Sequence, residues 1–243
     1  MTDGGHDRRL AILDRLLGHE EGFATERLCQ VCADVTGASG AGIMLMAGDI
    51  PHGSVCTTDD VSALIEQLQY DLGEGPCVDA YEKDRPVLEP DLAHPTVPRW
   101  VAFAGPAVDA GARAVFGFPL QVGAVRLGAL NLYNDEPGSL TDDQYNDALV
   151  MADVAAQAVL LLQADAPPES VAAELESNAN FQYVVHQASG MVAAQLEISV
   201  GLALIRLRAH AFGSGGSLTG VARAVVDRKL RFDADGLAED RKP

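Results

Sequence analysis

The sequence predicts an α+β domain, with a central antiparallel sheet and flanking helices, followed by a small all-α domain of three helices. Three short apolar segments bounded by Gly or Asn indicate strands, and longer segments with apolar residues at helical spacing surround them. Both element types around one sheet are typical of the α+β class. The consecutive Pro167 and Pro168 then separate the last helical segments from the rest.

The strands are expected in the first part of the chain. The segments "AGIMLMAG" (41–48), "AVFGFPLQVG" (114–123) and "VRLGALNLYN" (125–134) are short and apolar. Gly123 lies between the last two and indicates a hairpin turn. These two strands are therefore expected to be adjacent and antiparallel.

Three helices are expected around this sheet, at residues 9–20, 26–38 and 141–163. The third has Thr141 as its candidate N-cap residue. Asp142 and Asp143 follow in the first turn, where the helix dipole favours negative charge. This segment is therefore expected to be one long helix.

The segment "QADAPPES" (163–170) predicts a domain boundary, because two consecutive prolines cannot continue a helix. We expect one domain over residues 10–163 and a second over 170–232. The second should hold helices at 170–196, at 198–213 with Ser199 as its cap, and after Ser217. A unit of this size buries little apolar area alone, so it is expected to pack against a second copy of the chain or against a helix of the first domain.

The charge differs between the two parts. The net charge is −18, yet residues 1–180 contain 9 Lys and Arg against 29 Asp and Glu, while residues 181–243 contain 8 against 6. No apolar run reaches the roughly 20 residues of a membrane span, and the N-terminus lacks a secretory signal pattern. We therefore expect a cytoplasmic protein with no membrane partner.

The four cysteines are expected to be reduced thiols in the core. Cys29 and Cys32 form a C-x-x-C inside a helical pattern, and Cys56 and Cys77 are isolated in the sequence. No second C-x-x-C is present to complete a zinc site. A redox pair at Cys29 and Cys32 is the alternative to core thiols. The sequence indicates no metal site and no cofactor.

The segment "YDLGEGPCVDAYEKDRPVLEPDL" (70–92), followed by "FGFPLQVGAVRLGALNLY" (116–133), resembles the GAF sensory domain in the form common in actinobacterial regulators. The resemblance covers residues 10–163. It implies a small ligand of unspecified identity between the sheet and the loops over it, with Glu74 and Cys77 as pocket candidates. The alternative is that "GEGPC" (73–77) only turns the chain into the next helix. Some GAF proteins reduce methionine sulfoxide with cysteines, but we expect no enzyme here.

Three later segments, "VVHQASGMVAAQL" (184–196), "ISVGLALIRLRAHAF" (198–212) and "SLTGVARAVVDRKLRF" (217–232), resemble the ANTAR domain, the RNA-binding module of bacterial antitermination regulators. They occur in that family's order and spacing and cover residues 181–232. The resemblance implies RNA contacts from nine residues: Gln187, Ser189, Gly190, Arg206, Arg208, His210, Arg223, Arg228 and Lys229. Ser189 stands where the family usually has lysine, so one basic residue is missing.

The basic residues themselves allow two interpretations. Arg206 and His210, at positions i and i+4, can share a helix face, whereas Arg206 and Arg208 are about 200° apart. Such residues can contact phosphates, or they can form solvated faces or pairs with the acidic first domain. Gly190 permits the close approach of another backbone or of a ligand, and the packing of one helix on another is the alternative explanation.

These observations predict a signal-responsive transcription antitermination regulator. Its first domain would sense a small ligand or a partner, and its second would bind stem-loop RNA. The long apolar helices at 141–163 and 170–196 predict a homodimer. The alternative is a GAF ligand sensor whose second domain serves only dimerisation or protein interaction.

Overall fold

The computed structural model describes residues 3–17, 25–47, 50–165, 183–232 and 238–240. It divides into two compact units, Met1–Asp165 and Ala166–Pro243, and each is described below by itself. The boundary expected at residues 163–170 stays a prediction, because most of that segment lies outside the described residues.

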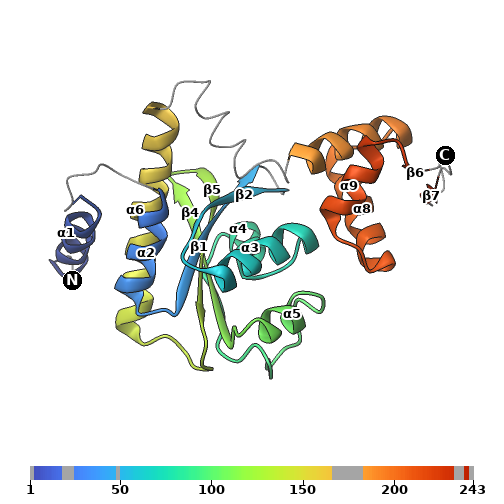
Figure 1. Ribbon diagram of the computed structural model, residues 1–243. Coiled ribbons are helices and arrows are strands. Elements are labelled where there is room, and N and C mark those ends of the chain that lie inside the picture. Colours follow the sequence, from blue (N-terminus) through green and yellow to red (C-terminus); the bar gives the residue numbers. More distant parts are fainter. Residues whose placement is uncertain (1–2, 18–24, 48–49, 166–182, 233–237, 241–243) are drawn as a thin grey trace. The chain divides into compact units, whose positions relative to one another are not determined.

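The first unit is built on one five-stranded antiparallel sheet, which confirms the α+β prediction (Figure 1). The strand order is β2-β1-β5-β4-β3, with β5 in the centre. The bounds are β1 Gly40–Ala47, β2 Ile50–Thr57, β3 Val87–Glu89, β4 Ala114–Val122 and β5 Val125–Asn134. The expected hairpin between β4 and β5 is present, with Val122 opposite Val125 and Gly123 at a φ of 60°.

One face of this sheet is covered by α2 (Thr25–Thr36) and α6 (Asp142–Asp165), and α1 (Asp3–Leu17) packs on these two helices. The main apolar core lies between these helices and the strands, and it includes the fully buried Leu28 and Phe116. Thr141 caps α6 as expected, because its hydroxyl accepts a hydrogen bond from the backbone N–H of Gln144 at 3.2 Å. The helix α1 is also held to α6 by ion pairs, such as Arg8 with Asp147.

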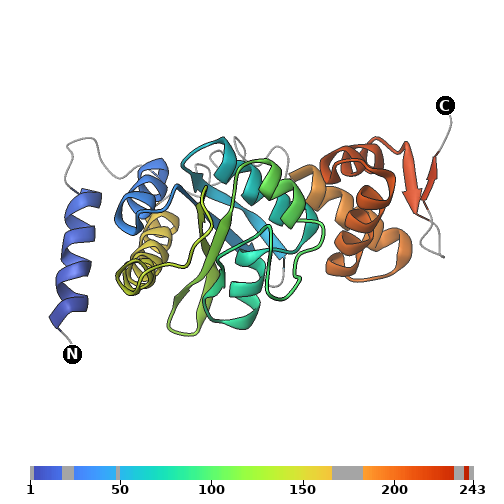
Figure 2. The same ribbon diagram turned by 90° about the horizontal axis from the view of Figure 1, so that it is seen from below.

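The opposite face is covered by α3 (Asp60–Leu72) and α4 (Pro76–Lys83), and α5 (Ala104–Asp109) packs against α3 (Figure 2). A capping box starts α3, in which the Asp59 carboxylate accepts from the backbone of Ser62 and the Ser62 hydroxyl accepts from the backbone of Asp59. Gly73 ends α3 at a φ of 69°, in the left-handed region that favours glycine. This face carries the polar residues described in the next subsection.

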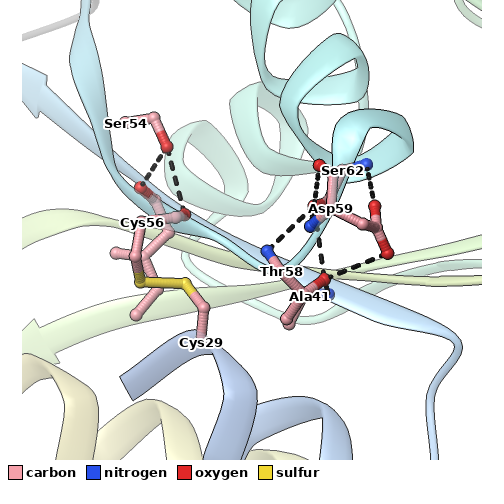
Figure 3. Close-up of a disulfide and its surroundings, with 8 residues drawn as sticks. Cys29, Ala41, Ser54, Cys56, Thr58, Asp59 and Ser62 are labelled. Carbon is pink, nitrogen blue, oxygen red and sulfur yellow. Dashed lines mark hydrogen bonds between the residues drawn. A yellow bond between two sulfur atoms is a disulfide. The ribbon is translucent and has the colours of Figure 1, made fainter. Parts of the chain in front are cut away.

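The expectation that all four cysteines are free thiols is wrong. Cys29 on α2 and Cys56 on β2 form a disulfide, with their Cα atoms 5.9 Å apart (Figure 3). The C-x-x-C pattern offered Cys32 as the alternative redox partner of Cys29, but Cys32 and Cys77 are both free and buried. The correct partner was hidden because β2, with the sequence "IPHGSVCT", lacks the apolar pattern of a strand and was not expected.

The second unit contains three described helical segments: residues Tyr183–Leu196, α8 (Val200–Ser214) and α9 (Leu218–Val226). Ser199 and Ser217 cap α8 and α9 as expected, each accepting from a backbone N–H three residues later. The helix α8 continues past Gly213 and is ended by Gly215 instead, at a φ of 65°. The expectation of an all-α unit is wrong in one respect, because β6 (Leu230–Phe232) and β7 (Ala238–Asp240) form a short antiparallel ribbon after the helices.

None of the described helices is by itself long and apolar enough to cross a membrane. The segments Tyr183–Leu196 and Val200–Ser214 reach that length and composition only when taken together, and the chain bends by 105° between them.

Candidate functional site

The first candidate site is a row of three residues across the middle of the sheet, on the face covered by α3 and α4. Asn131 on the central strand β5 lies opposite Gly42 of β1 on one side and opposite Gly117 of β4 on the other. Residues directly opposite one another in an antiparallel sheet point to the same face. The amide of Asn131 is therefore flanked by two positions that have no side chain. We call Gly42, Asn131 and Gly117 the central row.

Two helices approach the sheet closely because both neighbours of Asn131 are glycines. A Cβ atom on Gly42 would lie 2.8 Å from the Glu66 Oε1 atom of α3. A Cβ atom on Gly117 would lie 2.3 Å from the carbonyl oxygen of Pro76, the first residue of α4. The carboxyl group of Glu66 and the start of α4 are therefore brought to the two ends of the central row.

The start of α4 is fixed to α3 by a side-chain hydrogen bond. The backbone N–H of Cys77 donates to Gln69 Oε1 at 2.7 Å. This bond gives a partner to one of the backbone N–H groups that the start of a helix leaves unpaired. Gly75 makes the arrangement possible, since a Cβ there would lie 2.5 Å from the Gln69 side chain, and its φ is 140°.

Five buried side-chain atoms beside the central row have no hydrogen-bond partner among the described residues. They are both carboxyl oxygens of Glu66, the Nε2 atom of Gln69, and the Oδ1 and Nδ2 atoms of Asn131. Each of the three side chains is at least nine-tenths buried. Burial also raises the pKa of Glu66 to about 8, because a charged carboxylate is poorly solvated there. Burial and, to a smaller extent, the nearby Glu66 raise the pKa of the Cys77 thiol, and the Gln69 side chain partly offsets this rise.

The two residues expected to line a ligand pocket have different surroundings. The Glu74 carboxylate accepts hydrogen bonds from the backbone N–H groups of Ala102 and Phe103, at 2.7 and 3.0 Å. Glu74 therefore fastens its turn to the segment that precedes α5. Cys77 is fully buried and lies beside the polar groups of the central row.

Glu66, Gln69 and Asn131 were missed at the sequence level. A signal was present in α3, where Glu66 and Gln69 fall on the same helical face as the buried Ile65 and Tyr70. Asn131 is likewise a polar residue inside the apolar strand segment "LGALNLYN". A polar side chain at an apolar position of either element is the pattern that would have identified the row.

The second candidate site is the basic surface of the second unit. Six of the nine residues expected to bind RNA have exposed side chains or, for glycine, exposed backbone: Gln187, Gly190, Arg206, Arg223, Arg228 and Lys229. Lys229 pairs with Asp227 at 2.9 Å. Arg228 has a φ of 62°, at the turn that follows α9. The exposed arginines thus come from α8, α9 and the turn after α9.

The other three expected residues are less accessible. Ser189 is buried, and its hydroxyl donates to the Val185 carbonyl at 2.8 Å, so its side chain does not lie on the surface. Arg208 is half-buried, and the half-buried His210 packs its ring against Phe232 with centroids 5.6 Å apart. The exposed Gly190 has no described atom near its Cβ position, so helix packing within the described unit does not explain it.

The exposed side of α8 also carries an apolar stripe. Leu202, Ile205 and Phe212 are 53%, 56% and 68% exposed, and their spacing places them on one side of the helix. Arg206 lies on the same side, one turn after Leu202. We call these four residues the α8 surface. It combines a positive charge with an exposed aromatic ring.

Comparison with protein families gives one match. The GAF domain family matches residues 24–159, which is more than half of the chain. The match includes α2, the whole sheet, α3, α4 and the central row. No curated protein sequence matches the chain.

Several solved structures are similar to the chain at low identity. They include the GAF domain of a phosphoenolpyruvate-protein phosphotransferase from Acinetobacter, with 11% identity, a TM-score of 0.48, and coverage of 69% of this chain and 99% of that one. A chromophore-binding domain of a bacteriophytochrome from R. palustris has 11% identity, a TM-score of 0.47 and coverage of 68% and 64%. A type II free methionine-R-sulfoxide reductase from Thermoplasma acidophilum has 15% identity, a TM-score of 0.43 and coverage of 65% and 95%.

Proposed function

The chain belongs to the GAF domain family, and on that premise we propose that it is a cytoplasmic regulator of transcription antitermination. Its first unit senses a small ligand, as GAF domains commonly do. Its second unit binds stem-loop RNA and transmits the signal to transcription. The proposal assigns no enzymatic activity to the chain.

The observation that carries the RNA half is the charge of the second unit. Residues 183–232 contain six Lys and Arg against two acidic residues, in a chain whose net charge is −18. Arg206, Arg228 and Arg231 are exposed there. Lys and Arg contacts to phosphates provide the part of RNA affinity that does not depend on sequence. The acidic first unit would at the same time repel nucleic acid.

The α8 surface adds a second kind of RNA contact. RNA loops and bulges expose unpaired bases, and proteins recognise these bases by stacking on aromatic rings and by hydrogen bonds. Phe212 is an exposed ring on the side of α8 that carries Arg206. A phosphate contact and a stacking ring on the same helix suit a stem-loop, which exposes unpaired bases, better than a uniform duplex.

Crosslinking in living cells tests this proposal. The full chain is crosslinked to RNA, purified and its bound RNA sequenced, with Arg206→Ala as the matched variant. Enrichment of stem-loop leader segments by the wild type, and less recovery by the variant, would support the proposal. Recovery of no RNA above background would refute the RNA half.

A second function is favoured by a specific observation. Ser189 is buried where the resembled family has lysine, and three residues of the α8 surface are apolar. These features suit a second unit that serves dimerisation or protein interaction without RNA. In that case crosslinking would recover no RNA, while the purified second unit would still form dimers or bind a protein partner.

A further inference from the structure

The five buried atoms without partners beside the central row define the chemistry of a ligand. Three of them are oxygen atoms that accept hydrogen bonds when Glu66 is ionised, and two are amide nitrogen atoms that donate. A buried polar group left without a partner destabilises the folded state. Packing alone does not explain why three such side chains on two elements lie together, whereas a bound molecule would supply the missing hydrogen bonds.

The charges around Glu66 restrict the ligand as much as its missing hydrogen bonds do. Among the described residues, no Lys or Arg side chain forms an ion pair or a hydrogen bond with Glu66. At this point β1 and β5 present the uncharged Gly42 and Asn131, and α4 presents the Cys77 thiol. The described side chains of β2 include no ionisable group apart from the disulfide-bonded Cys56, and Asp109, the ionisable residue of α5, is exposed. The described side chains of these elements therefore provide Glu66 with no positive partner.

We propose that the central row binds a small ligand with an amidine or amine group, whose positively charged N–H donors pair with the Glu66 carboxylate and with Asn131 Oδ1. This proposal rests on the ligand-sensing half of the proposed function, and it adds the chemical class of the ligand. A cation supplies both the donors and the charge that Glu66 lacks. An anionic ligand would instead face a buried carboxyl group and no described cation.

The proposal has a direct consequence for pH. Without ligand, the Glu66 pKa of about 8 keeps this group mostly protonated at neutral pH. A cation binds the ionised form, so binding releases a proton and the affinity rises as the pH increases. With a pKa of about 8, the ionised fraction rises about tenfold between pH 7 and pH 9, and the affinity should rise by the same factor.

Three small probes of nearly the same planar shape test the charge preference. Acetamidinium is cationic, acetamide neutral and acetate anionic, and each is titrated into the full chain while the side-chain amide signals of Asn131 and Gln69 are followed by NMR. We expect saturable shifts with acetamidinium, much weaker ones with acetamide and none with acetate. Glu66→Gln should weaken acetamidinium binding at least about tenfold, because it removes a charge-assisted hydrogen bond. The matched control is Glu82→Gln, an exposed carboxyl of α4 whose loss should have no effect.

Three results would overturn the proposal. The first is acetate binding as tightly as acetamidinium, and the second is an acetamidinium affinity that does not change between pH 7 and pH 9. The third is the absence of saturable acetamidinium binding to the wild type. RNA binding is measured separately by crosslinking, so its loss with acetamidinium binding intact would refute the RNA half of the proposed function and leave the ligand class standing.

Discussion

Gly117→Ala tests directly whether α4 is held against the sheet through the central row. The new Cβ atom would lie 2.3 Å from the carbonyl oxygen of Pro76 and 2.6 Å from its carbonyl carbon. Both are backbone atoms at the start of a helix, so neither can rotate away as the end of a flexible side chain can. Overpacking of this kind usually costs about 1–3 kcal/mol, and we expect the upper end of that range.

Two other glycines provide matched comparisons. A Cβ on Gly42 would meet the movable end of Glu66 at 2.8–3.0 Å, so Gly42→Ala should cost less than Gly117→Ala. Gly105 lies in α5 with no described atom within 4 Å of its Cβ position. Gly105→Ala should therefore change the free energy of unfolding by less than about 1 kcal/mol, because the better helix propensity of alanine is opposed by the restriction that Pro106 places on the residue before it.

The assay is equilibrium unfolding in urea, followed by circular dichroism for the wild type and the three variants. We expect similar unfolding free energies for the wild type and Gly105→Ala, a lower one for Gly42→Ala and the lowest for Gly117→Ala. Gly117→Ala as stable as the wild type within about 0.5 kcal/mol would refute the close approach of α4 to the sheet.

Three further outcomes follow from the fold. Cys56→Ala should lower the free energy of unfolding by about 3.5 kcal/mol under oxidising conditions, since the disulfide closes a loop with a sequence separation of 27; an unchanged stability would argue against the bridge. Glu66→Gln should raise the melting temperature at pH 9 and little at pH 4. The raised pKa of Glu66 gives stability that is present below the ordinary pKa of a glutamate and is lost as the pH rises through about 8, so equal effects at both pH values would contradict its burial. Light scattering should give a dimer mass, because Leu149 and Leu161 are exposed on α6; a monomer mass would contradict this.

Local patterns in the sequence predicted much of the fold. The strands β1, β4 and β5 have apolar segments bounded by Gly or Asn, and the caps Thr141, Ser199 and Ser217 are single polar residues before a helical pattern. Such features depend on residues close in the chain, so they can be identified without knowing the tertiary structure. The strands β2 and β3 were missed because the first is rich in polar and turn residues and the second has three residues.

The central row could not be predicted in the same way. It depends on the register that places Asn131 opposite both Gly42 and Gly117. The turn at Gly123 predicts that β4 and β5 are neighbours, but no local pattern specifies that β1 pairs with β5. The disulfide was missed for the same reason, because it joins a helix to a strand that had not been identified. The RNA candidates on the surface depend mainly on charge and helix phase, so most of them were found exposed, whereas the burial of Ser189 required the packed structure.

The central claim, that the second unit reads RNA through its basic surface, is tested most directly by a salt titration of RNA binding. Filter binding to total cellular RNA is measured for the wild type, for Arg206→Ala and for Arg85→Ala, an exposed arginine of the first unit that serves as the control. Losing one phosphate contact should reduce the slope of log affinity against log salt by about 0.7 to 0.9 in Arg206→Ala alone, with an unchanged melting temperature. A wild type that binds no RNA at low salt, or an Arg206→Ala slope equal to that of the wild type, would contradict the claim.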